Sequence, residues 1–175
     1  HYTFTNFSTQ SKYLNSQGTL LPFDSEIYSV VTLKHLTKNN YVVGADKGLF
    51  LFNVNDLTFT QIDIGVLNKA KVNSLEWDNN EMLWVATSEG LVKLKFEKNE
   101  VTSAFFYNNE VKNWSKLNVT WVERVIRDIE GNMWVGTRGA GVITFNNKGE
   151  FTHYKNENTF SNKLNFVNCS NQEAR

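Results

Sequence analysis

The sequence has almost none of the residues that build covalent or metal-held frameworks. It contains one cysteine and three histidines among 175 residues. A lone cysteine, Cys169, cannot form an internal disulfide bond, and the histidines (His1, His35 and His153) are far apart and match no metal-binding spacing. We therefore expect no disulfide framework, no metal site and no cofactor.

Net charge and long apolar runs are also missing. The 18 basic and 18 acidic residues give a formal net charge of +0, so there is no electrostatic reason to expect nucleic acid or an anionic membrane as a partner. No apolar stretch approaches the ~18 residues that a membrane-spanning helix requires, so we expect no direct membrane insertion by this segment. Hydrophobic residues still make up 41% of the chain, which is enough for a core.

The motifs of common enzyme sites are missing too. No serine lies in a nucleophile elbow, and residues 138–141 read as a hairpin rather than as the strand-to-helix junction of a phosphate-binding loop. Asp128 with Gly131 and Asn132 looks like part of a calcium loop, but the closing Glu of such a loop is absent. We interpret this stretch as a turn in which Asp128 caps backbone N–H groups and Gly131 takes a positive φ. The segment is therefore not expected to be an enzyme.

The sequence does contain an internal repeat. Residues 72–94 and 122–145 share three residue types at intervals of six positions, followed by a turn and a glycine-led strand. The shared positions are Val72, Asp78 and Trp84 in the first segment and Val122, Asp128 and Trp134 in the second.

A weaker third copy precedes these two. Tyr41–Ala45 takes the place of the Trp strand and Gly48–Phe52 that of the next strand, after a first strand at 27–33. With Tyr41 aligned to Trp84 and Trp134, the spacings are 43 and 50 residues. Those spacings are close to the ~40–50-residue period of a four-stranded propeller blade.

The repeat predicts an all-β fold made of β-propeller blades. Each blade is a four-stranded antiparallel unit, and stacking such units buries the faces of their sheets. A β-sandwich has a similar number of strands but would not need the same Trp and Gly at a period of ~45 residues. We accordingly interpret Trp84 and Trp134 as packing residues between blades rather than as platforms for a sugar ring.

We expect a single propeller segment over residues 1–175. It would comprise about three complete blades, near 27–65, 70–107 and 119–155, and partial blade strands at 1–9 and 163–170. Three blades with partial strands would leave sheet faces and edges open. The segment is therefore expected to be a fragment of a larger propeller.

The most regular copy covers residues 128–142. It begins Asp128-Ile129-Glu130-Gly131-Asn132-Met133-Trp134-Val135-Gly136-Thr137. This stretch resembles the two-component regulator propeller repeat, whose pattern is an Asp-x-x-Gly-Asn turn, a Trp-Val/Ile-Gly-Thr strand and a glycine-containing turn. Residues 72–94 fit with departures, since Asn80-Glu81 replaces Gly-Asn and Ala86 replaces Gly, and residues 27–52 fit only in their second half.

The resemblance covers most of residues 27–170 and implies a function. Such repeats are typical of the periplasmic sensor region of membrane-bound histidine kinases, including the hybrid two-component systems of Bacteroidetes that respond to glycans. The resemblance implies a non-catalytic, ligand-sensing propeller in the periplasm that recognises an oligosaccharide. Its expected partners are the remaining blades and the kinase of the parent chain, and a second copy in a homodimer. The alternatives are a scaffold for protein–protein contact and, with less support, a propeller lyase or hydrolase.

Candidate ligand-binding residues follow from propeller geometry. The turn between the second and third strands of a blade emerges on the same face as the connections between blades. Charged side chains in these turns, a basic residue on an innermost strand, and the extra aromatics of the 108–122 connection would therefore gather at one mouth. These six residues are Lys47, Glu89, Arg138, Arg124, Trp114 and Trp121. The alternative reading is that the charges are solvated turn residues and that the tryptophans fold onto their own blade.

Overall fold

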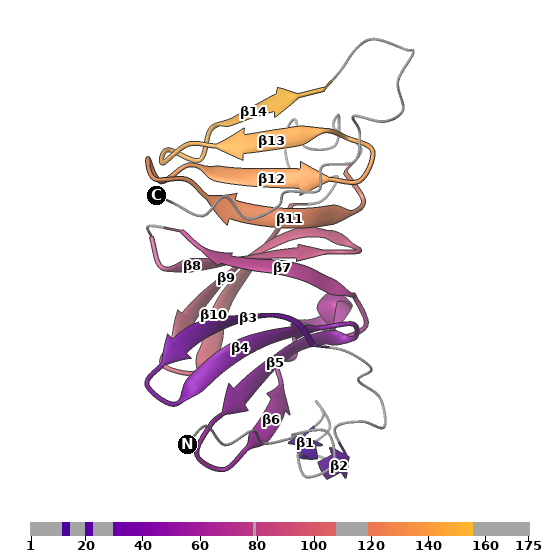
Figure 1. Ribbon diagram of the computed structural model, residues 1–175, viewed down its shortest axis with the longest axis vertical. Coiled ribbons are helices and arrows are strands. Elements are labelled where there is room, and N and C mark those ends of the chain that lie inside the picture. Colours follow the sequence, from indigo (N-terminus) through magenta and orange to yellow (C-terminus); the bar gives the residue numbers. More distant parts are fainter. Residues whose placement is uncertain (1–11, 15–19, 23–29, 79, 108–118, 156–175) are drawn as a thin grey trace, which may run out of the picture.

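The computed structural model describes residues 12–14, 20–22, 30–78, 80–107 and 119–155. They form three sheets that are stacked one on another along the long axis of the molecule (Figure 1), and all strand pairs are antiparallel except that of β1 with β6. In the described part of the chain, no helix is long and apolar enough to cross a membrane. The partial strands predicted at 1–9 and 163–170 lie outside the described residues.

Each sheet contains four consecutive strands in sequence order, and the first sheet has two further strands. The first sheet consists of β3 (Val30–Thr37), β4 (Asn40–Ala45), β5 (Gly48–Asn53) and β6 (Thr58–Gln61), and β1 (Lys12–Leu14) and β2 (Leu20–Pro22) extend it beyond β6. The second sheet consists of β7 (Val72–Trp77), β8 (Met82–Thr87), β9 (Gly90–Glu97) and β10 (Glu100–Tyr107). The third sheet consists of β11 (Val122–Arg127), β12 (Met133–Thr137), β13 (Val142–Phe145) and β14 (Phe151–Tyr154).

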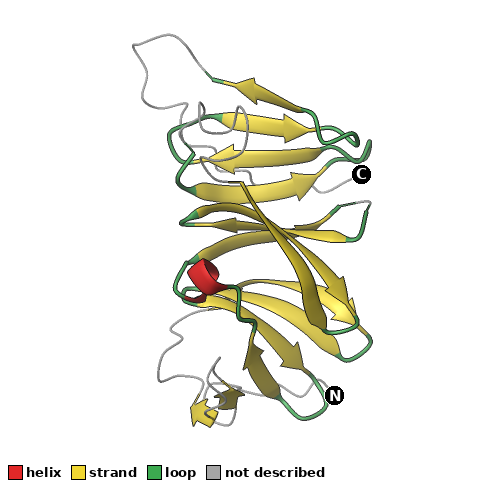
Figure 2. Ribbon diagram, turned by 180° about the vertical axis from the view of Figure 1, so that it is seen from behind, coloured by secondary structure: helices red, strands yellow, loops and turns green. Residues whose placement is uncertain are grey.

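The first strands of the three sheets lie next to one another. Strand β7 contacts both β3 and β11, and the later strands of each sheet lie progressively farther from this row. Figure 2 shows the short 3-10 helix η2 (Gly65–Asn68) in the connection between the first and second sheets. This arrangement confirms the predicted all-β fold of stacked propeller blades.

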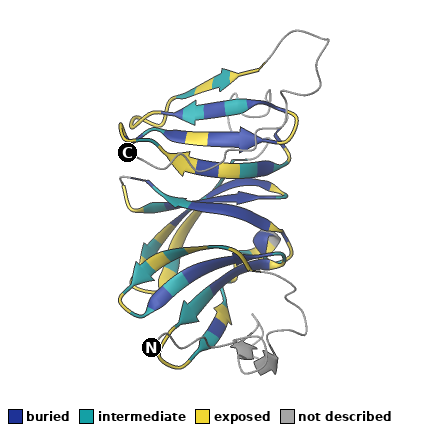
Figure 3. Ribbon diagram, in the orientation of Figure 1, coloured by how far each residue is buried: buried dark blue, intermediate teal, exposed yellow. Residues whose placement is uncertain are grey.

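The core lies between the sheets because side chains alternate between the two faces of each strand. In β8, Leu83 and Val85 pack toward the first sheet, whereas Trp84 and Ala86 pack toward the third. The second sheet is therefore covered on both faces, and most residues of its strands β7 and β8 are buried (Figure 3).

The turn before each Trp strand is held by an aspartate. One carboxylate oxygen of Asp128 accepts hydrogen bonds from the backbone N–H groups of Glu130 and Asn132 (3.0 and 2.8 Å), and Gly131 has φ 88°. These observations confirm the predicted turn. Asp78 caps its own turn in the same way.

The same aspartates also anchor the tryptophans. The second carboxylate oxygen of Asp78 accepts a hydrogen bond from Trp84 Nε1 at 2.9 Å, and that of Asp128 accepts one from Trp134 Nε1 at 2.8 Å. A buried indole N–H needs such a partner. The six-residue interval from Asp to Trp in the repeat thus corresponds to one hydrogen-bonded unit that joins a turn to the packing surface between sheets.

The two tryptophans differ in what covers them. Trp84 is 2% exposed, stacks on Tyr107 and meets the edge of Phe145 from the third sheet. Trp134 stacks in the same way on Tyr154 but is 38% exposed. The prediction of a packing role is confirmed for Trp84. For Trp134 the packing role stays a prediction, because in the described part of the chain no further sheet covers that face.

The structure also corrects the alignment of the first copy. Gly44 takes the place that Ala86 has in the second sheet, because in both sheets the first strand bulges immediately before this pair. Val42, and not Tyr41, is therefore the equivalent of Trp84. A shift of one residue turns a side chain to the other face of a sheet. Accordingly Val42 belongs to the core between the first two sheets, and Tyr41 to the far side of the first sheet.

The boundaries of one strand also differ from the prediction. The first strand of the first blade was placed at 27–33, whereas β3 continues to Thr37; residues 27–29 lie outside the described part of the chain. The strand continues because Thr37 pairs with Asn40 in a tight turn, without the longer aspartate-capped loop of the other two sheets.

We predict that Gly44→Ala destabilises the fold. A Cβ at this position would lie 2.4 Å from Val72 Cγ1 and 2.8 Å from Thr32 Cγ2, in the tightly packed gap between the first two sheets. Overpacking of this kind costs about 1–3 kcal/mol of the free energy of unfolding, which urea denaturation measures. In a Val72→Ala background the cost should shrink, and an equal cost in both backgrounds would exclude the Val72 contact as its cause.

Candidate functional site

The six predicted ligand-binding residues were expected to gather at one edge of the stack of sheets. The β4–β5, β8–β9 and β12–β13 turns, which contain Lys47, Glu89 and Arg138, all lie at this edge, on the right of Figure 1. We call it the turn edge. The opposite edge, which contains the β3–β4, β7–β8 and β11–β12 connections, is called the hairpin edge.

Two of the predicted residues meet at the turn edge. The Arg138 guanidinium lies 4.1 Å from the centroid of the Trp121 ring, and the Arg138 backbone N–H donates to the Trp121 carbonyl at 3.0 Å. Arg138 Nε also donates to Glu123 Oε1 at 2.6 Å, and the two side chains form an ion pair. Glu123 was not among the predicted residues. Trp121, Glu123 and Arg138 together form what we call the turn-edge cluster.

The remaining predicted residues are not placed in this cluster. Arg124 lies on β11 with an exposed side chain, and Lys47 and Glu89 are exposed in the turns of their own sheets. Trp114 lies outside the described residues. A role in ligand binding stays a prediction for all six. In the described ranges, no group of three or more His, Cys, Asp or Glu side chains could hold a metal ion.

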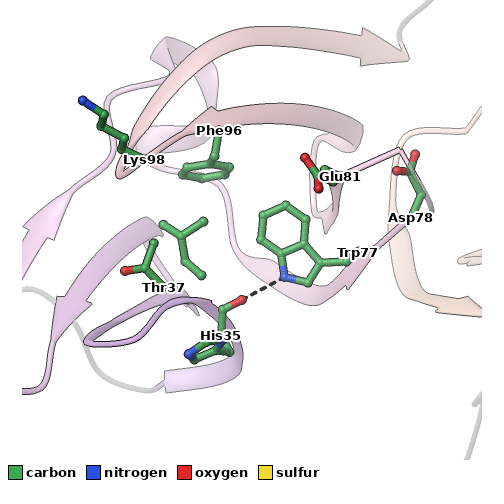
Figure 4. A pocket seen from close by; sticks show the side chains of 8 residues that line it. His35, Thr37, Trp77, Asp78, Glu81, Phe96 and Lys98 are labelled. Atoms are coloured by element: carbon green, nitrogen blue, oxygen red, sulfur yellow. Dashed lines mark hydrogen bonds between the residues drawn. The ribbon is translucent and has the colours of Figure 1, made fainter.

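A pocket opens at the other edge, between the first and second sheets. Its volume is about 370 Å³. It lies at the hairpin edge, and side chains from both sheets line it (Figure 4). The lining residues are His35, Leu36 and Thr37 from β3, Trp77 from β7, Asp78 and Glu81 from the following loop, Phe96 from β9 and Lys98 from the β9–β10 turn. We call it the Trp77 pocket.

Two aromatic rings and the Glu81 carboxylate lie together in the Trp77 pocket. Trp77 and Phe96 meet edge to face with ring centroids 5.9 Å apart, and Trp77 Nε1 donates to the His35 carbonyl at 3.0 Å. Figure 4 shows Glu81 beside the Trp77 ring and Lys98 beyond Phe96. The pocket therefore offers apolar ring surface together with a carboxylate, and the Lys98 side chain extends outward from its rim.

Asp78 lies at one end of this pocket and is held in its charged form. Burial alone would raise the pKa of Asp78. Hydrogen bonds from Trp84, Met82 and Asn80 and the charge of Lys93, 3.4 Å away, outweigh burial and hold the pKa below its ordinary value of 3.8. Its carboxylate is already saturated with donors, so it shapes the pocket rather than offering a free acceptor.

Sequence reasoning missed Trp77, although a signal was present. Trp77 pairs with Leu83 just as Arg127 pairs with Met133 in the third sheet. An aromatic residue at this position is thus not part of the repeat. Packing between repeats explains only recurring residues, so a tryptophan found in one copy alone was the better indication of a site.

Comparison with solved structures shows the same fold in extracellular domains. That of BT3049 from B. thetaiotaomicron, described as a hybrid two component system, matches with a TM-score of 0.55 and 15% identity over 73% of this chain and 17% of its own. Two structures of the extracellular domain of BT4673 from the same organism match with TM-scores of 0.57 and 0.56 and 19% and 18% identity. They are described as one component and hybrid two component systems, and each match covers 90% of this chain and 24% of the other.

These neighbours are extracellular domains of two-component systems, the class whose propeller repeat the sequence resembles. The chain spans about a quarter or less of their length. At these identities the likeness establishes the fold alone. No family model and no curated protein matches the sequence.

The charged state of Asp78 predicts an acid-sensitive fold. Because its pKa is lower in the folded than in the unfolded chain, the carboxylate stabilises the fold above pH ~4, and this contribution is lost as the pH falls through the folded pKa. Asp78→Asn should therefore be less stable than the wild type at about pH 7, and the difference should narrow toward about pH 3.

Urea denaturation at a series of pH values measures this effect. Trp84→Phe, which removes one donor to Asp78, should weaken the pH dependence without abolishing it. Parallel stability curves for the wild type and Asp78→Asn would contradict the assignment.

Proposed function

We propose that this chain is part of a non-catalytic, ligand-sensing propeller in the periplasm. It recognises an oligosaccharide and passes the signal to a kinase outside this chain. The fold shared with extracellular domains of two-component systems supports the proposal, as does the repeat in residues 128–142.

The turn-edge cluster is the observation that carries the proposal. Arg138 is fixed in orientation by the Trp121 ring and by Glu123, and yet its side chain remains 47% exposed. A planar guanidinium with several N–H donors suits vicinal hydroxyl groups, and its fixed orientation lowers the entropy lost on binding. The cluster therefore presents a pre-organised polar surface to a neutral, hydroxyl-rich ligand.

The remaining blades of the parent chain would pack on the exposed face of the third sheet. On this face Trp134 pairs with Thr144 across β12 and β13, in the position where Trp84 pairs with Lys93 in the second sheet. In the second sheet the equivalent surface, which contains Trp84, is buried under the third sheet. A further sheet over Trp134 would complete the same contact, and rearrangement of such sheets within a homodimer would carry the signal.

A scaffold for protein–protein contact is the second candidate. The partly exposed Trp134 lies beside exposed Ile126 and Tyr154, and an exposed apolar surface of this kind also suits a protein partner. Binding of a protein in the absence of any saccharide affinity would favour it.

We predict that a panel of oligosaccharides contains a ligand for the full sensor region and that the turn-edge cluster contributes to its binding. Isothermal titration calorimetry should show affinity about tenfold lower for Arg138→Ala, because a charged hydrogen-bond donor is lost. Lys148→Ala, an exposed basic residue of the β13–β14 turn, is the matched control and should bind as the wild type does. No binding to any saccharide, alongside binding to a protein, would reject the proposal in favour of the scaffold.

A second prediction concerns Trp134. Its fluorescence, taken as the difference between the wild type and Trp134→Phe, should be quenched readily by acrylamide in this chain. In the longer sensor region the same difference signal should be protected, because a further sheet covers the ring. Equal quenching in both would contradict the proposed packing of further blades.

A further inference from the structure

The Trp77 pocket occupies a position that is nearly filled elsewhere in the molecule. The corresponding gap between the second and third sheets holds a cavity of only about 40 Å³, lined by Trp84 among others. Between the first and second sheets the residue equivalent to Trp84 is Val42, and the volume is about 370 Å³. The larger volume thus lies in the gap where the repeat's tryptophan is replaced by Val42.

The side chains of the pocket depart from the repeat as well. Glu81, and not Asn80 as the sequence comparison had it, takes the place of Gly131, because each lies three residues after the aspartate of its turn. Phe96 lies in β9, which extends to Glu97, whereas β13 ends at Phe145, so the second sheet has paired strands where the third already turns. Lys98 lies in the β9–β10 turn, as Gly149 does in the β13–β14 turn. An aromatic residue and two charged residues therefore line the open gap, and glycines stand in the corresponding turns of the third sheet.

Two of these replacements carry a conformational cost. Glu81 and Lys98 both have φ 59°, a left-handed conformation that non-glycine residues seldom adopt, whereas Gly131 and Gly149 have φ 88° and 78°. Side chains held in this region of φ persist where the surroundings require them, and such residues cluster at binding sites. The pocket therefore retains two charged side chains at positions where glycine would fit with less strain.

We infer that the Trp77 pocket is a second saccharide subsite, which takes one neutral sugar residue. The inference takes the class of ligand, a saccharide, from the proposed function. It places this second contact at the hairpin edge rather than at the turn edge. The C–H face of a sugar ring can pack on Trp77 and Phe96, where apolar surface is buried. Hydroxyl groups donate to the Glu81 carboxylate, which lies beside the Trp77 ring.

The charges of the pocket favour a neutral ligand over an ionic one. Glu81 and Lys98 carry opposite charges, so their electrostatic potentials offset each other for an ion placed between them. An anionic ligand would also face Asp78, whose charge is stabilised by its own donors. A volume of about 370 Å³ lies within the range of small-molecule sites and at its lower end.

The test uses the whole chain and methyl glycosides of common hexoses and pentoses as probes. In ¹H–¹⁵N spectra, the indole N–H signal of Trp77, identified by its loss in Trp77→Phe, should shift on titration with at least one glycoside. The double variant Glu81→Gly, Lys98→Gly should bind that glycoside about tenfold more weakly. Its unfolding midpoint should be no lower than that of the wild type, because glycine relieves the strained φ at both positions.

Leu57→Gly is the matched control. Leu57 has φ 58° but does not line the pocket, so this variant should keep the wild-type affinity. Undiminished affinity in the double variant, or shifts confined to Trp121 and Arg138, would overturn the second subsite while leaving the proposed function intact. The absence of shifts with every methyl glycoside and of heat with every oligosaccharide would overturn both.

Discussion

The hydrogen bond from Trp84 to Asp78 is the interaction on which the arrangement of the sheets depends. It joins the cap of a hairpin turn to the largest side chain in the gap between two sheets. The turn thereby fixes the indole, and the indole fixes the distance at which the next sheet packs. Asp128 and Trp134 repeat the unit on the third sheet. In the first sheet, where Leu36 and Val42 stand at these positions, the unit is missing and the gap widens into a pocket.

Much of this architecture could be read from the sequence. The six-residue interval between Asp and Trp gave the correct strands for the second and third sheets, because it reflects a local hydrogen bond. The first copy was misaligned by one residue, since Tyr41 is aromatic and the true equivalent, Val42, is not. Gly44 was the more reliable marker, because its close approach to Val72 leaves no room for a side chain. The exposure of Trp134 could not be foreseen, since burial depends on what packs against a surface and not on the residue itself.

The candidate sites also differ in how far they could be predicted: local sequence signals identified some residues, and contacts between distant strands determined the others. Turn position alone brought Arg138 and Trp121 to one edge, and the structure places them in contact. The partner Glu123 lies 15 positions away from Arg138 and follows from pairing between strands rather than from a motif. The Trp77 pocket requires two sheets to be placed relative to each other, and Trp77 and His35 are 42 positions apart. Only the failure of Trp77 to recur hinted at it, because the packing of repeats accounts for residues that recur.

Asp78 contacts groups on both faces of the second sheet. Its carboxylate borders the Trp77 pocket on one side of the second sheet and binds Trp84, which packs against the third sheet, on the other. The two gaps on either side of the second sheet therefore share one charged group, the Asp78 carboxylate. A ligand in the pocket that alters the donors around this carboxylate would change the free energy of the Trp84 contact. By reciprocity, the Trp84 contact would change the binding free energy of that ligand by the same amount. Asp78 is thus a single side chain that contacts both gaps on either side of the second sheet.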